Sequence, residues 1–352
     1  MKIIHKSILK DLAITFTISL ISLNLFLLME KILRLSRFLS GVGASATDML
    51  RIILYLQPQL MMLTIPMSLL LTILLTYGRL NADNELTALR VAGMSFRSIS
   101  APVLILGMAC FFVGLIISFY ISPMSAVKLR SYISKTITQR APMAIETGIF
   151  NTSFRDVVIL VNGRQEGRMN GIFIYDRREK NEPKVLIAKE GRVHADNEQN
   201  LGLYMNDGYI HIAKPEGSVE VFFQRYNLVL NLMLEGPSRK NSEMTPFELL
   251  KAARDSKSGD RVSLFLEFHR RLSFPSLCLI LMFLGPPLSL VSGRSGRFGG
   301  LTVGLSVFTA FYLILIYGEN MAKSGALPHY TGAWAPVVIT GICSLWAFRQ
   351  TE

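Results

Sequence analysis

The sequence is poor in charged residues for its length. Only 18% of its 352 residues are charged, whereas 50% are hydrophobic, and the mean hydropathy is +0.38. A soluble domain needs a larger polar share to cover its wetted surface. This composition excludes an ordinary soluble protein and indicates that much of the chain contacts lipid.

Cysteine is also scarce. The three cysteines, Cys110, Cys278 and Cys343, all lie inside long hydrophobic stretches. At such positions they predict neither a disulfide framework nor a metal cluster, and packing as small apolar side chains is the simpler interpretation. None of the five histidines has the spacing of a metal ligand. We therefore expect no cofactor in this chain.

Familiar catalytic signatures are missing. The sequence has no G-x-x-x-x-G-K-[ST] phosphate loop, no H-E-x-x-H motif and no G-x-S-x-G elbow. The glycine-rich stretch 293–300 is not followed by Lys-Ser/Thr, so we interpret it as a tight basic turn between two spans. An intramembrane enzyme would have to rely on Asn24, Glu319 and Asn320, which form no recognisable catalytic set. The sequence therefore gives little reason to expect an enzyme.

Long hydrophobic runs are abundant. A window of about 19 residues identifies six of them, each roughly long enough to cross a bilayer as a helix. They are 12–29, 54–76, 99–120, 273–291, 301–317 and 333–348. Buried helices of a large soluble protein are the alternative, but such helices are rarely so uniformly apolar. We expect an α-helical integral membrane protein with six transmembrane helices, three on each side of a middle region.

Basic residues in the short loops predict the orientation. Nine Lys and Arg fall on the side of the N-terminus and five on the other side, which favours a cytoplasmic N-terminus. With six spans, the C-terminus is also expected in the cytoplasm and the middle region outside it. The nine are Lys2, Lys6, Lys10, Arg79, Arg90, Arg97, Arg294, Arg297 and Arg349; the five are Lys31, Arg34, Arg37, Arg51 and Lys323. The net charge of +12 is scattered, so no nucleic-acid partner is expected.

The middle region has the pattern of a β domain. Short alternating segments bounded by Gly, Asn and Asp indicate strands, and their regular spacing predicts an antiparallel sandwich or jelly roll. The expected strands are 157–161, 171–175, 185–188, 201–205, 209–213 and 219–232. Turns are expected at Asn162-Gly163, Asp176-Arg177 and Asn206-Asp207-Gly208. The chain is thus predicted to divide into 1–124 (spans one to three), 125–265 (β domain with connecting helices) and 266–352 (spans four to six).

Two helices are expected where this region returns to the membrane. The first begins at Thr245, because Pro246 and Glu248 suit the first turn of a helix. The second is 261–271, which leads into the fourth span.

Lys31 and Arg34 are candidate ligands for an anionic head group. They lie three positions apart at the outward end of the first span, so they share one helix face. Two cations there would meet a phosphate lodged between helices, and arginine can grip it through two hydrogen bonds. The alternative is that they are ordinary interfacial side chains reaching for water, assisted by a Glu30–Arg34 pair.

The loop between the second and third spans is a candidate docking element. Residues 80–93 predict a short amphipathic helix, capped by Asn81 or Asp83 and ended by Gly93. Glu85 falls near its N-terminal end. A short helix across the cytoplasmic mouth of two spans has the form with which a transporter subunit docks onto a separate ATPase, and an interfacial helix is the equal alternative.

At these residues the sequence resembles the LptF/LptG family, the transmembrane subunits of the lipopolysaccharide export ABC transporter. The motifs that resemble the family are Lys31-x-x-Arg34, Pro66-Met67-Ser68-Leu69-Leu70, Asn84-Glu85-Leu86-Thr87 with Ala92-Gly93, the Pro123 exit from the third span, and Arg294-x-Gly296-Arg297. The first of these motifs and the segment Glu267-Phe268-His269-Arg270-Arg271 resemble LptF more than LptG.

The resemblance implies a role for the chain and a set of partners. A permease of this family extracts lipopolysaccharide from the inner membrane and passes it to a periplasmic β-jelly-roll bridge. Its implied partners are an LptG-like homologous subunit, two copies of an LptB-like cytoplasmic ATPase that binds ATP and magnesium, and LptC-like and LptA-like periplasmic jelly-roll proteins. Lys31 and Arg34 match the positions that face the lipid phosphates, and Glu85 matches the acidic residue that contacts the ATPase. A membrane-anchored subunit that actuates a periplasmic partner without carrying lipid is the alternative.

Overall fold

The computed structural model describes the chain with short gaps. The described ranges are 3–40, 45–144, 147–154, 156–165, 168–179, 182–197, 200–214, 217–231, 240–255, 258–292 and 299–350. Within them, the side chains of 34–40, 135–144, 151–154, 164–165, 193–197, 200–201, 214, 230–231, 258–260 and 291–292 are outside the description. The chain forms two compact units, 1–30 with 55–127 and 239–352, and 31–54 with 128–238.

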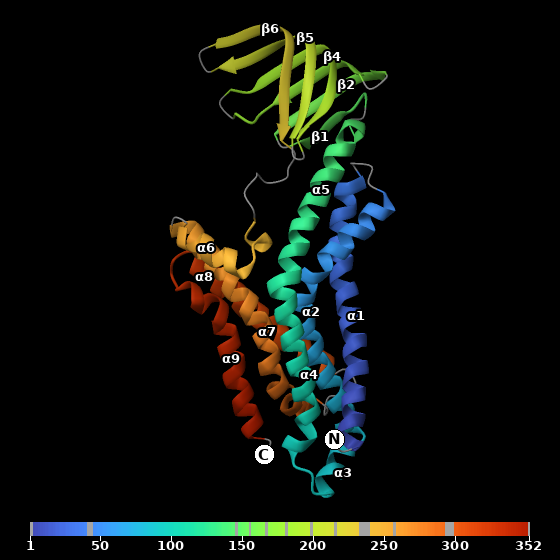
Figure 1. Cartoon of the computed structure of the whole chain (residues 1–352), viewed down its shortest axis with the longest axis vertical. Helices are drawn as coiled ribbons and strands as arrows, with labels where there is room; N and C mark the ends of the chain where they lie inside the picture. Colours follow the sequence, from blue (N-terminus) through green and yellow to red (C-terminus); the bar gives the residue numbers. More distant parts are fainter. Residues whose placement is uncertain are drawn as a thin grey trace. The chain divides into compact units, whose positions relative to one another are not determined.

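The prediction of six membrane-crossing helices is confirmed. Six helices or helix runs among the described residues are long and apolar enough to span a bilayer. The helices that contain these spans are α1 (Ile3–Ser40), α2 (Ala46–Ala82), α4 (Phe96–Ile116), α7 (Ser258–Ser292), α8 (Gly299–Lys323) and α9 (His329–Arg349) (Figure 1). Most of them are longer than the expected spans because polar turns extend the helix beyond the apolar stretch.

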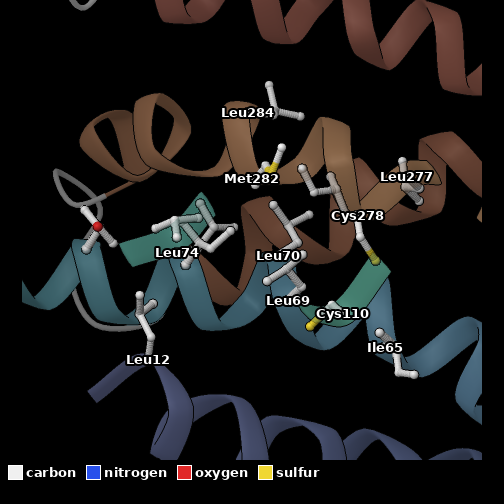
Figure 2. Packing of buried hydrophobic residues seen from close by; sticks show 14 of the residues in the cluster. Leu12, Ile65, Leu69, Leu70, Leu74, Cys110, Leu277, Cys278, Met282 and Leu284 are labelled. Atoms are coloured by element: carbon white, nitrogen blue, oxygen red, sulfur yellow. The ribbon is translucent and has the colours of Figure 1, made fainter. Parts of the chain in front are cut away.

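The core of the first unit is built on α2 and α7. The apolar stretches of these two helices are mostly buried, whereas at most 33% of the residues in those of the other four are buried. Figure 2 shows Leu69, Leu70 and Leu74 of α2 between Leu12 of α1 and Met282 of α7, all members of one hydrophobic cluster. The outer helices therefore present apolar side chains to lipid or to a partner chain.

Glycines let the membrane helices approach closely. A side chain at Gly318 of α8 would meet the carbonyl oxygen of Gly332 on α9 at 2.8 Å, and one at Gly285 of α7 would meet Ile73 of α2 at 2.6 Å. Helices in a membrane associate mainly through such close packing, because lipid and side chains are equally apolar. Small residues at these crossings therefore determine which helices are neighbours.

The helix that contains the third span does not end at Pro123. α4 continues through a π-helical turn, η1 (Ile117–Ile121), into α5 (Ser122–Ala144), which reaches towards the first strand (Figure 1). The exit of the third span from the membrane at this proline stays a prediction, but the helix itself does not end there, since Pro123 is the second residue of α5. Because Pro123 has no amide hydrogen, it cannot continue the i→i−4 hydrogen-bond pattern at this point, and the π-helical turn just before it accommodates the interruption without ending the helix.

The expected antiparallel β domain is confirmed as one sheet of six strands. They are β1 (Phe150–Phe154), β2 (Val157–Gln165), β3 (Arg168–Asp176), β4 (Lys184–Asn197), β5 (Asn200–Lys214) and β6 (Gly217–Asn231) (Figure 1). Each strand pairs with the next in sequence, in the order β1-β2-β3-β4-β5-β6. β1 was missed because its short Asn-Thr-Ser centre is not typical of a strand.

A crease crosses the sheet from β2 to β6. The pairing is regular on both sides of one row but skips the row itself, which consists of Asn162, Gly171, Lys189, Asp207 and Gln224. Gly171 and Asp207 have positive φ angles of 63° and 50°. The alternation of buried and exposed residues is also interrupted there. In β4 the next buried residue after Ala188 is Gly191, three positions later, where regular alternation would bury residue 190. Each strand therefore bends at the same row while the register is kept.

Two of the three expected turns are in fact crease positions. Asn162-Gly163 lies inside β2, and Asn206-Asp207-Gly208 lies inside β5, so 201–205 and 209–213 form one strand. The residues that favour turns also tolerate the left-handed backbone conformation that a sharp strand bend requires. Only the expected turn at Asp176-Arg177 follows the end of a strand.

Candidate functional site

The short helix between α2 and α4 is present as α3 (Glu85–Val91). Asn84, and not Asn81 or Asp83, occupies its N-cap, with a left-handed φ of 58° and no side-chain hydrogen bond. Gly93 ends it as expected, with φ 85°. The amide of Gly93 donates to the carbonyl of Arg90 at 2.9 Å, and the amide of Met94 donates to that of Leu89 at 3.1 Å. This is the Schellman pattern, which stops a helix at glycine.

α3 is held to the helix bundle on one side and exposed on the other. Leu86 is buried in the hydrophobic core of the first unit, and the Arg90 guanidinium lies 5.3 Å from the centre of the Phe96 ring. Glu85 and Thr87 are exposed, and Val91 is 84% exposed. An exposed apolar side chain on the same short helix as the exposed carboxylate of Glu85 offers contact area to a partner.

Polar contacts fix the helix ends around α3. The Tyr77 hydroxyl of α2 donates to the carbonyl of Ile99 on α4 at 2.8 Å, and Arg79 of α2 pairs with Asp11 of α1 at 2.6 Å. These contacts join α1, α2 and α4 at the end of the bundle where α3 lies. A force applied to α3 would therefore reach three membrane helices.

Lys31 and Arg34 both lie in the last turns of α1. Lys31 is partly buried. The side chain of Arg34 lies outside the described residues, although its backbone is helical. Whether they share one helix face and bind a head group stays a prediction. Lys31 belongs to the second compact unit and Glu85 to the first.

The folded sheet has a filled inner face. Buried side chains from both sides of the crease form one cluster, for example Ile174 and Leu186 from one side and Met205 and Leu228 from the other. The crease therefore brings the two halves of the sheet against each other.

The side chain of Arg178 bridges the two halves of the sheet, with an ion pair on one side of the crease and a hydrogen bond on the other. The Arg178 guanidinium forks onto Asp176, with Nε 3.0 Å from Oδ1 and Nη2 2.6 Å from Oδ2, and its Nη1 donates to the carbonyl of Val229 at 2.9 Å. Val229 lies on β6 beyond the crease. Burial would raise the pKa of Asp176, but the hydrogen bonds and charge of Arg178 outweigh it and lower that pKa. We call this contact the latch; the sequence indicated only a turn at Asp176.

A hollow of about 650 Å³ lies along the crease. Its lining includes Lys189, Asp207 and Gln224 of the crease and the aromatic rings of Tyr209 and Phe222. Tyr209 alternates along β5 with the buried Ile210, and Phe222 on β6 is 78% exposed, whereas Phe223, which also lines the hollow, packs against the buried cluster. It combines apolar rings with one charge of each sign.

The polar residues considered for an intramembrane enzyme lie on two different helices. Asn24 is buried in α1, whereas Glu319 and Asn320 lie in α8, and no hydrogen bond or ion pair described in the structure joins them. Over the described ranges, no three His, Cys, Asp or Glu side chains are grouped so as to hold a metal ion.

Comparison with known proteins gives a consistent match. Residues 6–350 match the family described as Lipopolysaccharide export system permease LptF/LptG. The chain is 22% identical over 334 residues to Uncharacterized protein RP871 of Rickettsia prowazekii, covering 90% of each chain. It is 21% identical over 286 residues to Lipopolysaccharide export system permease protein LptF of Escherichia coli K12, covering 79% of this chain and 75% of that protein. The six membrane-crossing helices around an antiparallel sheet, together with this match over nearly the whole sequence, show that the chain is a multi-pass membrane protein and belongs to the LptF/LptG family of lipopolysaccharide export permeases.

Proposed function

We propose that this chain is the LptF-like subunit of an ABC transporter that extracts lipopolysaccharide from the bacterial inner membrane and passes it to its own periplasmic β domain. It pairs with a homologous permease subunit, and two copies of a cytoplasmic ATPase supply the energy. LptC-like and LptA-like β proteins receive the lipid. The N- and C-termini are in the cytoplasm, and residues 125–265 form the receiving domain between the two sets of spans.

The observation that carries this proposal is the form of α3. It is a separate helix, anchored by Leu86, and it exposes Glu85, Thr87 and Val91 between two membrane helices. An ATPase that binds this face moves α2 and α4 directly, because both helices are joined to α3 by short connections. In this role Glu85 contacts the ATPase.

Energy input is required by the chemistry of the cargo. Each methylene group that leaves a bilayer for water costs about 0.8 kcal/mol, so several long acyl chains would cost many tens of kcal/mol if they crossed water bare. An apolar path from membrane to sheet lowers this cost. Lys31 and Arg34 would hold the lipid phosphates at the entrance, since a guanidinium binds phosphate through paired hydrogen bonds.

The sheet offers a way to pass the lipid onward. β6 is an edge strand of the described sheet, and Val219, Val221 and Phe222 on it are exposed. An unpaired edge can add a strand from a neighbouring β protein, which would make one continuous apolar surface.

Replacing Glu85 with arginine tests the role of α3. We expect Glu85→Arg to lower lipopolysaccharide release per ATP hydrolysed by at least about tenfold, because reversing a charge at an interface costs several kcal/mol. Asp83→Arg makes the same change two residues earlier, at an exposed position outside α3, and should stay within about twofold of wild type. Unchanged release by Glu85→Arg in a reconstituted complex would contradict the assigned role.

Photo-crosslinking separates lipid transport from purely mechanical action. A crosslinking residue in place of Met205, on the inner face of the sheet, should form lipopolysaccharide adducts during ATP turnover. The same residue in place of its neighbour Tyr204, which is 45% exposed on the outer face, should form few. If the inner position gives no lipid adduct, the chain instead actuates a partner without carrying lipid.

A further inference from the structure

Arg271 is a buried cation without a role in the function proposed above. It is 2% exposed and lies in α7, at the end of the segment Glu267-Phe268-His269-Arg270-Arg271. A guanidinium is placed in such surroundings only if its donors are satisfied, because an unpaired buried charge is very unfavourable. Its partners therefore indicate what it does.

The side chain of Arg271 binds the segment by which the chain returns from the sheet. This return segment, residues 241–244, contains the short helix η2 (Asn241–Glu243) and precedes α6 (Pro246–Asp255). Nη2 of Arg271 donates to the carbonyls of Asn241 at 3.1 Å and Ser242 at 3.0 Å, and Nη1 donates to that of Met244. Nε donates to Glu267 Oε1 at 3.2 Å, which orients the guanidinium. One side chain thus holds three backbone carbonyls of a four-residue segment to α7.

The backbone of Arg271 binds the helix by which the chain leaves for the sheet. Pro275 has no amide hydrogen, so the carbonyl of Arg271, four residues earlier, loses its usual helical donor. The hydroxyl of Ser118, which is fully buried in η1, donates to this carbonyl at 2.8 Å. One turn earlier, Gly114 of α4 has no side chain, and a Cβ there would lie 3.4 Å from Pro275. A glycine and a proline thus allow the contact to form.

Both covalent connections between the membrane helices and the sheet therefore bind the same residue. We propose that Arg271 is a positioning residue that ties the outgoing helix η1–α5 and the return segment to α7, so that movement of α7 reaches the sheet through both connections at once. We call Arg271, Ser118 and residues 241–244 the joint. The transport part of this proposal rests on the proposed function, whereas the tie itself does not.

Replacing Arg271 with lysine tests whether its hydrogen-bond geometry matters in addition to its charge. Arg271→Lys keeps the charge opposite Glu267, but an ammonium group cannot reach three carbonyls and a carboxylate at once as the flat guanidinium does. Arg270→Lys is the matched control, since Arg270 binds Glu267 at 2.6 Å, is 37% exposed in its side chain and makes no described contact with the return segment.

The tie can be measured without any transport assay. A cysteine in place of Ser242, in a background with Cys343 replaced by serine, reports access to the return segment through its rate of maleimide labelling. In the full complex we expect Arg271→Lys to raise this rate at least about tenfold, the effect of losing one or two hydrogen bonds to a charged donor, and Arg270→Lys to leave it within twofold. Equal labelling rates in the two variants would overturn the joint.

A disulfide tests whether the tie matters for delivery. The side chains of Asn241 and Ser263 touch, with Nδ2 3.1 Å from Oγ, so Asn241→Cys with Ser263→Cys can reconnect the return segment to α7. We expect Arg271→Lys to keep ATP hydrolysis within about twofold but to lower lipopolysaccharide delivery about tenfold, again the scale of one or two such bonds. Oxidation of the cysteine pair should restore delivery, and reduction should remove it again.

The outcomes distinguish the joint from the function on which it rests. Wild-type delivery by Arg271→Lys, or a loss that the oxidised disulfide does not repair, would overturn the coupling role. If the wild-type complex delivers no lipopolysaccharide, the proposed function fails, and the labelling rates alone decide whether Arg271 ties the two connections.

Discussion

Asp176 illustrates how much a single ionised side chain contributes to the folded sheet. Its carboxylate is buried and accepts hydrogen bonds from the Arg178 side chain and from the Arg178 amide at 3.0 Å. Because its pKa is lowered in the folded protein, its contribution is complete above the ordinary aspartate pKa and is lost as the pH falls through the folded value. The latch is therefore stable at neutral pH and weakens in acid.

Asp176→Asn tests the latch. At pH 7 we expect this change to lower the free energy of unfolding of the sheet by about 1–3 kcal/mol, the cost of weakening charged hydrogen bonds in a partly exposed pair. The difference from wild type should begin to narrow below about pH 4, the ordinary aspartate pKa, and disappear as the pH falls through the lowered pKa of Asp176 in the folded protein. Amide hydrogen exchange of β3 and β6 in the full chain measures both effects.

The control for the latch is an exposed carboxylate on the same sheet. Glu220→Gln alters a side chain that is 56% exposed and whose contact with His211 is long, at 3.4 Å. Such an exposed pair contributes little, so this change should leave the amide hydrogen exchange rates almost unchanged. A difference between Asp176→Asn and wild type that is the same at pH 7 and pH 3 would show that ionisation of Asp176 does not stabilise the latch.

Residue-level signals predicted the helix ends better than the strand ends. The helix start at Thr245 was predicted from Pro246 and Glu248, and in the structure Glu248 also accepts a hydrogen bond from the Thr245 amide at 2.8 Å, which forms a capping box. Gly93 likewise ends α3 as expected. Lys31, Arg34 and Glu85 remain predictions as functional residues. Arg271 was noted only as part of a motif, because its partners in the return segment are near it in space and distant in sequence.

Among the elements, α8 and α9 depend on a contact between two glycines. A Cβ at Gly318 would lie 2.8 Å from the Gly332 carbonyl oxygen, and backbone cannot move aside as a flexible side chain can. We expect Gly318→Ala to destabilise the helix bundle by about 1–3 kcal/mol, as overpacking of a tight core does. Thermal unfolding in detergent micelles measures this change.

Gly78 in α2 provides the opposite expectation for the same substitution. Nothing lies within 4 Å of a Cβ at this position. Gly78→Ala should therefore stabilise the protein by up to about 1 kcal/mol through helix propensity. Destabilisation by both variants to the same degree would show that the contact between α8 and α9 is not tight in solution.

Element boundaries were predictable where one physical signal dominated. Uninterrupted hydrophobicity located all six spans, because the bilayer requires it. The strands of the sheet were harder to delimit, since Asn and Gly residues favour both a turn and a bend inside a strand. β5 was divided for this reason, and the continuation of α4 into α5 was missed because proline usually ends a helix, whereas here the π-helical turn before Pro123 accommodates it.

At the scale of the whole molecule, the proposed orientation places α3 and the sheet on opposite sides of the membrane. With Cys343 replaced by serine, the remaining Cys110 and Cys278 are buried. In sealed inside-out vesicles, an impermeant maleimide should label Thr87→Cys and not Gln224→Cys, and intact spheroplasts should show the reverse. Labelling of both positions from one side would overturn the assigned topology.

The crease changes what a sheet of this size can enclose. The strand pairing on one side of the crease is separate from the pairing on the other side. The two halves of the sheet can therefore rotate about the crease as a hinge when a few backbone angles in that row change. The ladders themselves need not break, and the latch between Arg178 and Val229 is one contact that resists opening. If the sheet receives lipid as proposed, an angle between the two halves, and not the shape of a fixed cavity, sets the width of the molecule it can enclose, which suits acyl chains that vary in number and length.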